Sequence, residues 1–282
     1  MSSLTALAGM GSRDFAVIAA IMQREARIHL VESKTTLVES RLARRVRLHG
    51  LASYSEYLDL VERDAQERAE MVTSLTTNHT HFFREAHHFD HLCETVLPKL
   101  KRSALAGDKV RIWSAGCSSG EEIYTLAMCL LGPGRNDGDW VFKNDVKLLA
   151  TDISPPVVAA VARGEYSAST VEPVPVRYRD RWMDKTPDGF AMKPEVRALI
   201  TARPLNLFAN WPMRGAFDVI FCRNVMIYFE EVAQAELQQK MATAMNPDGH
   251  LYIGHSERLT GSADGLFEKC GQTIYRRNGS KV

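Results

Sequence analysis

The chain carries almost no net charge, since 35 Lys and Arg residues oppose 34 Asp and Glu residues among 282. Proteins drawn to nucleic acid by their overall charge have a clear basic excess, so this balance argues against a nucleic-acid partner. The chain also lacks any C-x-x-C spacing, and its cysteines are odd in number, at five. This pattern argues against a disulfide framework and favours reduced thiols, as in a cytosolic protein.

Targeting segments and long apolar runs are missing as well. The first residues show no basic stretch followed by an apolar run, and no segment approaches the apolar length that spans a membrane. We therefore expect a cytoplasmic protein without membrane insertion, which still allows docking on the cytosolic part of a membrane protein. The 45% hydrophobic content is ordinary for a globular protein and allows one large domain or two smaller ones.

Residues 13–70 have the apolar spacing of helices and no strand-like alternation. In the first expected helix, apolar residues recur every three or four positions: Phe15, Ile18, Ala19, Met22 and Ala26. Ser53 or Ser55 is expected to cap a later helix. We predict an all-α N-terminal domain over residues 1–92 and a linker over residues 93–106.

From residue 107 onward, short apolar runs alternate with helical ones. The expected strands are residues 110–113, 146–151, 217–222 and 250–254, and the expected helices are residues 121–131, 155–163 and 231–245. This alternation predicts an α/β, Rossmann-like domain over residues 107–282 with a mostly parallel sheet. Residues 165–202 are rich in proline and predict a small inserted β or mixed subdomain. Residues 266–277 look like two short strands.

The first of these strands leads into a loop of small residues, 114–120, and then into a helix that begins Glu121-Glu122. Such a turn lets a ligand approach the backbone closely, although a tight turn without a ligand is the alternative. The dinucleotide fingerprint is broken, because Ser118 and Glu121 stand where its second and third glycines belong. Two acids also oppose a pyrophosphate, whereas they tolerate the positive charges of S-adenosylmethionine.

Polar residues follow two further strands of the predicted sheet. Asp152 ends one of them and can accept both hydroxyls of a ribose, or it can cap the next helix if Ser154 does not. Arg223 and Asn224 directly follow another apolar strand, which is unusual for pure core. Asn224 is expected at the carboxyl edge of the sheet, beside the small-residue loop, unless it is a simple turn asparagine.

Several segments, taken in order, resemble the CheR family of chemotaxis receptor methyltransferases: residues 76–89, 113–122, 150–153, 217–229, 247–249 and 254–257. The resemblance covers nearly the whole chain. It implies a class I methyltransferase fold and S-adenosylmethionine as cofactor, with S-adenosylhomocysteine as product. It also implies methyl transfer to glutamate side chains on the cytoplasmic helices of chemoreceptors, which gives glutamate methyl esters.

Carried over position by position, the resemblance implies these cofactor contacts: Asn78, Thr80, Arg84, Glu122, Asp152, Asn206, Leu207, Asn224 and Val225. A glutamate carboxylate is already ionised at pH 7 and needs no general base. Arg84 is our candidate catalytic residue, because a guanidinium can steer that carboxylate. It could equally bind the cofactor's own carboxylate or pair with Glu85. Tyr228 is expected either to line the substrate side of the site or to pack in the core.

A basic helix face formed by Arg41, Arg44 and Arg45 is expected to hold the acidic substrate helices. The alternative is pairing with the acidic residues of segment 56–64. Family members that dock on a receptor's C-terminal pentapeptide resemble one another in a Gly-x-Gly-Arg loop. Residues 183–190 lack it, so we expect no docking of that kind, and we expect a monomer.

A cluster of histidines invites a zinc interpretation: His79, His81, His87, His88 and His91. No cysteine or acid completes a known ligand spacing, so we expect neutral interface histidines and no metal.

Other functions can be built on an α/β fold of this kind. An oxidoreductase is disfavoured, since the gap from Gly120 to Asp152 exceeds the roughly 20 residues of a nicotinamide site. A nucleic-acid methyltransferase is disfavoured by the lack of an Asn-Pro-Pro-aromatic signature. A non-catalytic receptor-binding adaptor, or a methyltransferase of another substrate on the same fold, is the remaining alternative. Four intact residues argue against the adaptor: Arg84, Glu122, Asp152 and Asn224.

Overall fold

The structure is a computed structural model that describes residue 7 and residues 9–279. Its contacts divide the chain into two compact units. A helical unit runs up to Thr77 and includes Tyr228–Ala233, and a sheet unit comprises Asn78–Ile227 and the residues from Gln234 onward. The outermost ends of the two expected domains, residues 1–6 and 8 and residues 280–282, lie outside the described residues. None of the described helices is long and apolar enough to cross a membrane.

The helical unit is built from amphipathic helices, as the sequence predicts. Its elements are α1 (Ser12–Ala26), a 3-10 turn (Glu32–Lys34), α2 (Thr35–Leu48), α3 (Tyr54–Arg63) and α4 (Ala65–Leu75). Burial of one apolar stripe holds α1 in place, and that stripe contains Phe15, Ile18, Met22 and Ala26. Of the two expected caps of α3, Ser53 fills the role, since its hydroxyl accepts the N–H of Glu56 at 3.2 Å.

A buried carboxylate joins three helices of this unit. Glu67 of α4 is 3% exposed, and it accepts hydrogen bonds from the Tyr57 hydroxyl at 2.6 Å and from Nε of Arg45 at 2.9 Å. Nε2 of His49 lies 2.9 Å from its second oxygen. Burial by itself raises the pKa of Glu67, but the hydrogen bonds from Arg45, Tyr57 and His49 lower it overall. Glu67 therefore stays ionised while tying α2 and α3 to α4.

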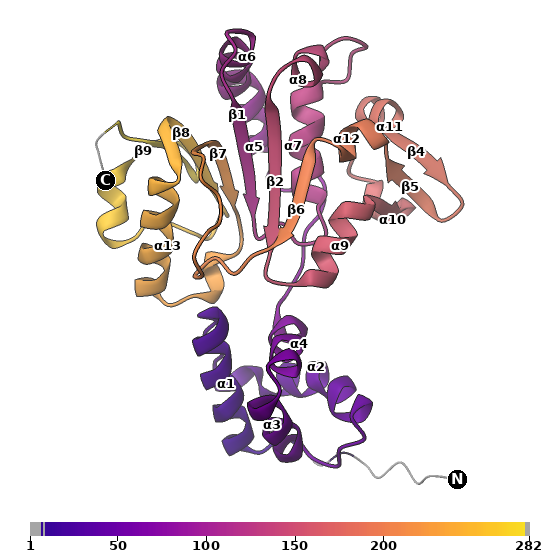
Figure 1. The fold of residues 1–282 in the computed structure, drawn as a ribbon, viewed down its shortest axis with the longest axis vertical. Helices are drawn as coiled ribbons and strands as arrows, with labels where there is room; N and C mark the ends of the chain where they lie inside the picture. Colours follow the sequence, from indigo (N-terminus) through magenta and orange to yellow (C-terminus); the bar gives the residue numbers. More distant parts are fainter. Residues whose placement is uncertain (1–6, 8, 280–282) are drawn as a thin grey trace. The chain divides into compact units, whose positions relative to one another are not determined.

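The sheet unit is an α/β domain whose larger sheet is mostly parallel, as predicted. The strands lie in the order β6-β2-β1-β7-β8-β10-β9. Their bounds are β1 (Val110–Ala115), β2 (Val146–Asp152), β6 (Ile200–Pro204), β7 (Phe217–Cys222), β8 (Met245–Ile253), β9 (Phe267–Gly271) and β10 (Ile274–Arg277). Strands from β6 to β8 pair in parallel, whereas β10 pairs antiparallel with β8 and β9. In Figure 1, β1 and β2 run side by side with their arrowheads toward the same edge.

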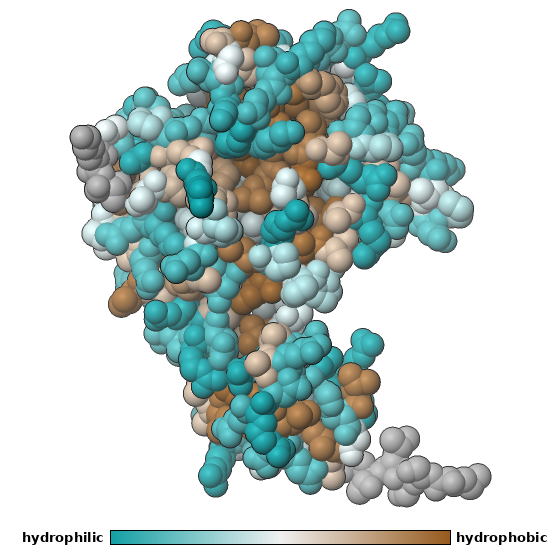
Figure 2. Space-filling model, viewed as in Figure 1, coloured by the Kyte–Doolittle hydropathy of each residue, from teal (hydrophilic) through white to brown (hydrophobic). Residues whose placement is uncertain are grey.

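Helices connect the parallel strands, as the alternating pattern predicts. They are α7 (Glu121–Leu131), α8 (Asp139–Lys143), α9 (Pro155–Arg163) and α13 (Glu231–Thr243). α7 packs against β1 and β2, and α9 packs against β2 and β6. Every residue of α7 except Glu122 is buried. On the face seen in Figure 2, hydrophobic residues gather over the middle strands of the sheet unit, with hydrophilic residues around them.

The segment expected as a linker is helical and packed. α5 (Ala86–His91), a π-helical turn (Leu92–Val96) and α6 (Leu97–Leu105) follow one another. Four residues at helical spacing join the core of the sheet unit: Leu92, Val96, Leu100 and Ala104. Burial of this stripe fixes the segment on the sheet. The unit boundary therefore lies at Thr77, earlier than the expected boundary at residue 92, and residues 93–106 are part of the sheet unit.

The small inserted β subdomain is present. Strands β3 (Glu165–Ser167), β4 (Met183–Thr186) and β5 (Gly189–Met192) form an antiparallel sheet in the order β3-β5-β4. Short helices surround it: α10 (Ala168–Val171), α11 (Val176–Trp182) and α12 (Pro194–Arg197). The insert ends slightly earlier than residue 202, because the chain rejoins the larger sheet at Ile200.

Arg45→Met is expected to lower the free energy of unfolding by about 2 kcal/mol or more, because it leaves the buried carboxylate of Glu67 without its cation. Urea unfolding followed by circular dichroism at pH 7 measures the loss. The matched control is Arg44→Met on the exposed side of the same helix, with an expected change below about 0.5 kcal/mol. Equal losses in the two variants would contradict the role given to Arg45.

Candidate functional site

The loop between β1 and α7 has an unusual backbone. Gly116 and Gly120 have φ angles of +81° and +101°, and Ser118 has a φ of +50°. A Cβ atom on Gly116 would lie 2.4 Å from a methyl group of Val225, and one on Gly120 would lie 2.9 Å from the hydroxyl of Tyr166. Side chains at the two glycines are therefore excluded both by backbone strain and by close packing. The loop is held directly against the segment that follows β7.

Backbone hydrogen bonds join this loop to the end of β2. The amides of Gly116 and Cys117 donate to the carbonyl of Thr151 at 2.8 and 2.9 Å. The amide of Ser118 donates to Oδ2 of Asp152 at 3.0 Å. The loop and the strand end thus form one rigid edge, at the place where open α/β sheets bind ligands.

Asp152 is largely buried at this edge, with 7% of its surface exposed. Its second oxygen, Oδ1, accepts the amide of Ser154 at 3.0 Å. Ser154 occupies the N-cap position of α9, although its hydroxyl makes no capping hydrogen bond. Burial raises the pKa of Asp152, and its backbone hydrogen bonds work against that rise. Each carboxylate oxygen has a further lone pair, so Asp152 can still accept two ribose hydroxyls.

A buried arginine joins three segments beside the loop. The side chain of Arg223 is 2% exposed, and its guanidinium lies 3.1 Å from Oε2 of Glu122 and 3.5 Å from Oε2 of Glu85. It also donates to the backbone carbonyl of Arg84. Oε1 of Glu122 accepts the hydroxyl of Ser114 at 2.7 Å. Burial raises the pKa of Glu122 even though Arg223 opposes the rise. Sequence reasoning found Arg223 unusual but gave it no role.

Glu257 fixes the segment after β7, and sequence reasoning missed this role. Its carboxylate accepts the amides of Asn224 at 3.0 Å, Met226 at 2.7 Å and Ile227 at 3.3 Å. It accepts the amide of Gly254 as well. Asn224 has a φ of +58°, which this ring of hydrogen bonds stabilises. The sequence contains one signal for this role, which is an acidic residue just beyond the end of an apolar strand.

Arg84 lies on the segment that Arg223 holds. Its guanidinium donates to the carbonyl of His79 at 2.9 Å. Glu85 faces Arg223 and His255, the latter at 3.0 Å from Oε1. Glu85 therefore pairs with Arg223 and His255 rather than with Arg84, as the alternative interpretation had it. A guanidinium has five N–H donors, so Arg84 retains donors for a carboxylate of cofactor or substrate.

The other expected cofactor residues lie on two segments. Asn78 is exposed and Thr80 is half-buried on the chain leading to Arg84. Asn206 and Leu207 follow β6, and the amide of Leu205 donates to the carbonyl of Asp152 at 2.8 Å, which places that segment beside Asp152. Asn206 accepts the amide of Phe208 at 2.9 Å, so its side chain shapes the turn.

Tyr228 belongs to the segment that clusters with the helical unit. Its carbonyl accepts the amide of His29 at 2.9 Å, and Phe229 forms an isolated bridge with Ile28. The expected role of Tyr228 at the substrate side stays a prediction.

Two of the three arginines expected to bind substrate serve the helical unit itself. Arg41 donates to the carbonyls of Leu75 at 2.7 Å and Thr76 at 3.1 Å, at the end of α4. Arg45 pairs with Glu67, as described above, rather than with the acidic segment 56–64. Arg44 is exposed, and so is Arg47 one turn further along α2. The basic surface that α2 presents is therefore centred on Arg44 and Arg47.

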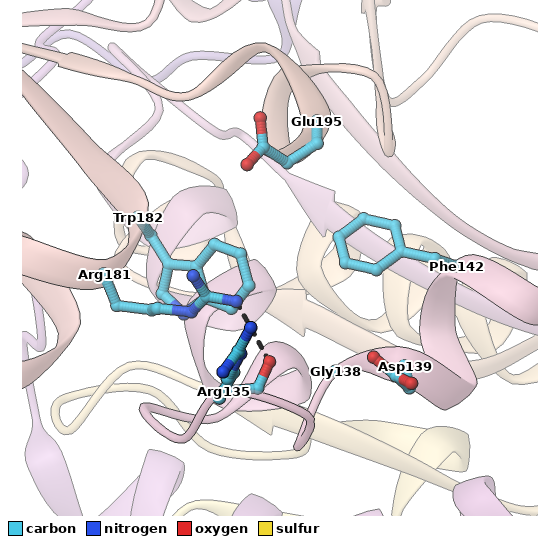
Figure 3. A pocket seen from close by; sticks show the side chains of 7 residues that line it. All are labelled: Arg135, Gly138, Asp139, Phe142, Arg181, Trp182 and Glu195. Carbon is cyan, nitrogen blue, oxygen red and sulfur yellow. Dashed lines mark hydrogen bonds between the residues drawn. The ribbon is translucent and has the colours of Figure 1, made fainter.

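A cavity of about 150 Å³ lies elsewhere in the sheet unit (Figure 3). It is lined by Arg135, Gly138, Asp139, Phe142, Arg181, Trp182 and Glu195. The guanidinium of Arg181 stacks 4.6 Å from the ring of Trp182 and donates to the carbonyl of Arg135 at 3.0 Å. Asp139 and Glu195 precede β2 and β6, whereas the predicted site residues follow the strands. The cavity is thus distinct from the candidate site.

Comparison with known proteins gives a consistent result. Residues 78–276 match the family described as CheR methyltransferase, SAM binding domain, and residues 13–76 match CheR methyltransferase, all-alpha domain. A probable chemotaxis protein methyltransferase of Rhizobium etli is 45% identical over 258 residues, which cover 89% of this chain and 95% of the relative. The chemotaxis protein methyltransferase of Escherichia coli is 34% identical over 280 residues, covering 96% of this chain and 93% of the relative.

Asp152→Ala is expected to weaken binding of S-adenosylhomocysteine by about 1.5–3 kcal/mol, because two buried ribose hydroxyls lose their acceptor. Titration calorimetry measures the affinity, and a thermal melt checks that the fold persists without the hydrogen bonds to Ser118 and Ser154. The matched control is Asp184→Ala, at an exposed aspartate of β4. If both variants bind like the unaltered chain, Asp152 is not part of the site.

Proposed function

The chain belongs to the CheR methyltransferase family, and we propose that it methylates glutamate side chains on the cytoplasmic helices of a chemotaxis receptor, giving glutamate methyl esters. It is an S-adenosylmethionine-dependent methyltransferase of chemotaxis. The match of both family domains, over residues 13–76 and 78–276, carries the proposal. We place the reaction in the cytoplasm and assign it to the monomer.

The carboxyl edge of the sheet fits the cofactor chemically. Bound there, S-adenosylmethionine supplies a methyl group activated by its sulfonium charge. Asp152 is the acceptor for the ribose hydroxyls, and Glu122 lies in the same acidic surroundings, which suit a cationic ligand. The hydroxyl oxygen of Ser118 is buried without a hydrogen-bond partner in the described part of the chain, so this loop has a donor and acceptor to offer. Asn206 and Leu207 extend the site from the end of β6.

The methyl transfer itself requires little acid–base catalysis by the protein. A glutamate carboxylate is the nucleophile at pH 7, so the enzyme has to align it with the methyl carbon and remove its water. Arg84 suits this task, since its guanidinium is held by the carbonyl of His79 and its backbone by Arg223. Glu122 and Glu85 neutralise Arg223, which leaves Arg84 as the cation that can meet an incoming carboxylate.

We expect Arg84→Ala to lose most turnover while the fold survives, because the carboxylate is no longer oriented. The measurement is transfer of radiolabelled methyl groups to receptor, with release of the label as methanol in mild base to identify an ester. Unchanged affinity for S-adenosylhomocysteine assigns Arg84 to the substrate, and lowered affinity assigns it to the cofactor. Arg102→Ala, at an exposed arginine of α6, is the control. Near-normal turnover of Arg84→Ala would contradict both the substrate-binding and the cofactor-binding role of Arg84.

The same assay separates the rival functions. A non-catalytic adaptor binds receptor but transfers no label, and it has no need to bind S-adenosylhomocysteine. A methyltransferase of another substrate binds S-adenosylhomocysteine but leaves receptor unlabelled. The buried Asp152 and Arg223 favour an active enzyme over the adaptor, because buried charges are costly to keep without a function for the site they build.

The exposed side of α2 is our proposed docking surface for the acidic receptor helices. Arg44 and Arg47 lie one turn apart, and the exposed Leu48 beside them, at 67% exposure, adds an apolar contact. Opposite charges steer the encounter and set its register more than they add affinity. We propose that a C-terminal receptor tail plays no part. The tight turn after edge strand β4 contains Pro187, which lacks an amide donor, and the acidic Asp188.

Arg44→Glu together with Arg47→Glu is expected to slow receptor methylation several-fold, because the reversed charges repel the acidic helices. The rate with the unaltered enzyme should fall as salt rises, and the double variant should lose that dependence. Receptor truncated at its C-terminus should be methylated as fast as full-length receptor.

The matched control for this test is Lys101→Glu together with Arg102→Glu, an equal charge reversal on the exposed side of α6. Arg41 and Arg45 stay unchanged in the test variant, since both hold the helical unit together. The docking surface is wrong if both double variants slow the reaction alike. Tight binding of an isolated receptor C-terminal pentapeptide would overturn the statement about the tail.

A further inference from the structure

A cluster of metal-binding side chains lies on the strands at the far side of the larger sheet from β6. One ligand atom each from His91, His250 and Cys270 lies within 4.8 Å of the other two. His91 ends α5, His250 lies in β8, and Cys270 lies in β9. None of these side chains has a role in the methyl transfer proposed above. The cluster is therefore separate from the proposed methyl-transfer site.

The strand geometry explains how the cluster forms. Side chains two positions apart on a strand point to the same face, so His250 and Tyr252 of β8 share a face. The ring of His91 lies over both, at centroid distances of 5.7 Å from His250 and 5.8 Å from Tyr252. The terminal strand pair then brings Cys270 to the same place. Three donors are thus fixed by a helix end and two strands of one sheet.

We propose that His91, His250 and Cys270 form a binding site for a zinc ion, with the fourth ligand position open to solvent. Two imidazoles and one thiolate are a preferred donor set of zinc, and three protein ligands with an open position are a known arrangement. Tetrahedral zinc, with Zn–N near 2.0–2.1 Å and Zn–S near 2.3 Å, needs donor separations of about 3.3–3.6 Å, so donors that lie within 4.8 Å of one another have to close by at most about 1.2–1.5 Å. Small side-chain rotations supply it, since Cys270 is exposed and His91 is half-buried.

A second contact prepares His91 for this role. Its Nδ1 lies 2.9 Å from the hydroxyl of Tyr252. In the tautomer with its proton on Nδ1, His91 donates to that oxygen and keeps the Nε2 lone pair for a metal, as metal-bound histidines characteristically do. Tyr252 is fully buried and stacked on Phe221 at 4.2 Å, so the orienting hydroxyl is itself fixed.

The protonation states of the two imidazoles suit a metal, and acidic residues outnumber the cations near the cluster. Burial lowers the pKa of His91 and lowers that of His250 to about 4, so both imidazoles are neutral at pH 7. Cys270 is exposed as a residue, but partial desolvation of its thiol raises the pKa, so a metal has to displace a thiol proton. The nearby cations are Lys99 and Arg276, and Glu94, Asp248 and Glu268 oppose them.

A second trio of possible ligands is a poorer site. Glu85, His87 and His88 also lie within reach of one another. Glu85, however, is engaged by the buried cation Arg223 and by His255, and Nε2 of His88 lies 2.9 Å from the hydroxyl of Thr273. A divalent ion beside a buried guanidinium is strongly repelled. The cluster that contains Cys270 is thus the one we assign.

The sequence pattern did not indicate this site. The expectation of no metal was argued from the histidines of segment 79–91 alone, where no cysteine completes a spacing. His250 and Cys270 come from strands far later in the chain, and only the sheet order places them beside His91. The present proposal uses just one histidine of that segment.

Cobalt replaces zinc as a coloured probe in the test. The full chain is reduced, stripped with a chelator and titrated with Co²⁺. We expect one equivalent to produce a thiolate-to-cobalt charge-transfer band together with the intense visible bands of tetrahedral cobalt, and excess Zn²⁺ to remove both. A wild-type chain that shows no such bands at micromolar protein and metal overturns the proposal.

Matched variants locate the ligands. Cys270→Ser, at an exposed position that tolerates the change, should abolish the charge-transfer band, whereas Cys93→Ser should retain it. His91→Gln should weaken Zn²⁺ binding by about 100-fold or more in competition with a chelating dye, and His87→Gln on the same helix should not. Zn²⁺ should raise the melting temperature of the unaltered chain but not of Cys270→Ser. A band that survives Cys270→Ser would contradict the proposal.

Discussion

The buried guanidinium of Arg223 is the contact on which the geometry of the candidate site depends. It lies between the carboxylates of Glu122 and Glu85 and also holds the backbone carbonyl of Arg84. Three segments that are distant in sequence therefore meet at one charge. Loss of that charge leaves the carboxylate of Glu122 without a cation and leaves Glu85 with its histidine partners alone. Breaking a fully buried ion pair destabilises a fold by about 3–5 kcal/mol. The position of Arg84 thus depends on the hydrogen bond from Arg223 to its backbone carbonyl, as well as on the contacts of the Arg84 side chain.

Two further acids act mainly on the backbone. Asp152 accepts the amides of Ser118 and Ser154, and Glu257 accepts the amides of Asn224 and Met226. Amides that are bound to side-chain acids are not available to a phosphate, which loops of this kind otherwise hold through their N–H groups. The acids that shape the edge therefore also select against nucleotides with a pyrophosphate. They leave a negative environment that accepts a sulfonium.

The sequence predicted those parts of the fold that depend on local pattern. The parallel strands, the small-residue loop and Asp152 were all visible, because an apolar run that ends in a polar residue marks a strand end in an α/β sheet. Segment 93–106 was misjudged as a linker although its apolar residues recur at helical spacing, because their burial depends on the sheet against which they pack. Arg45 and Glu257 depend on partners far away in the chain. Exposed and buried charges look alike in a sequence, so their roles needed the tertiary structure.

One aromatic stack positions both polar clusters of the sheet unit. Phe89 of α5 stacks on Phe221 of β7 at 5.6 Å, and Phe221 stacks on Tyr252 of β8 at 4.2 Å. Arg223 lies over the ring of Phe89 at 5.5 Å, while the hydroxyl of Tyr252 holds His91. Stacked rings of this size bury much apolar surface and have few rotamers. They therefore fix both the position and the orientation of the polar groups that contact them. Apolar packing therefore positions the ring systems beside Arg223 and His91, and the charged groups complete the geometry and determine what the edge can bind.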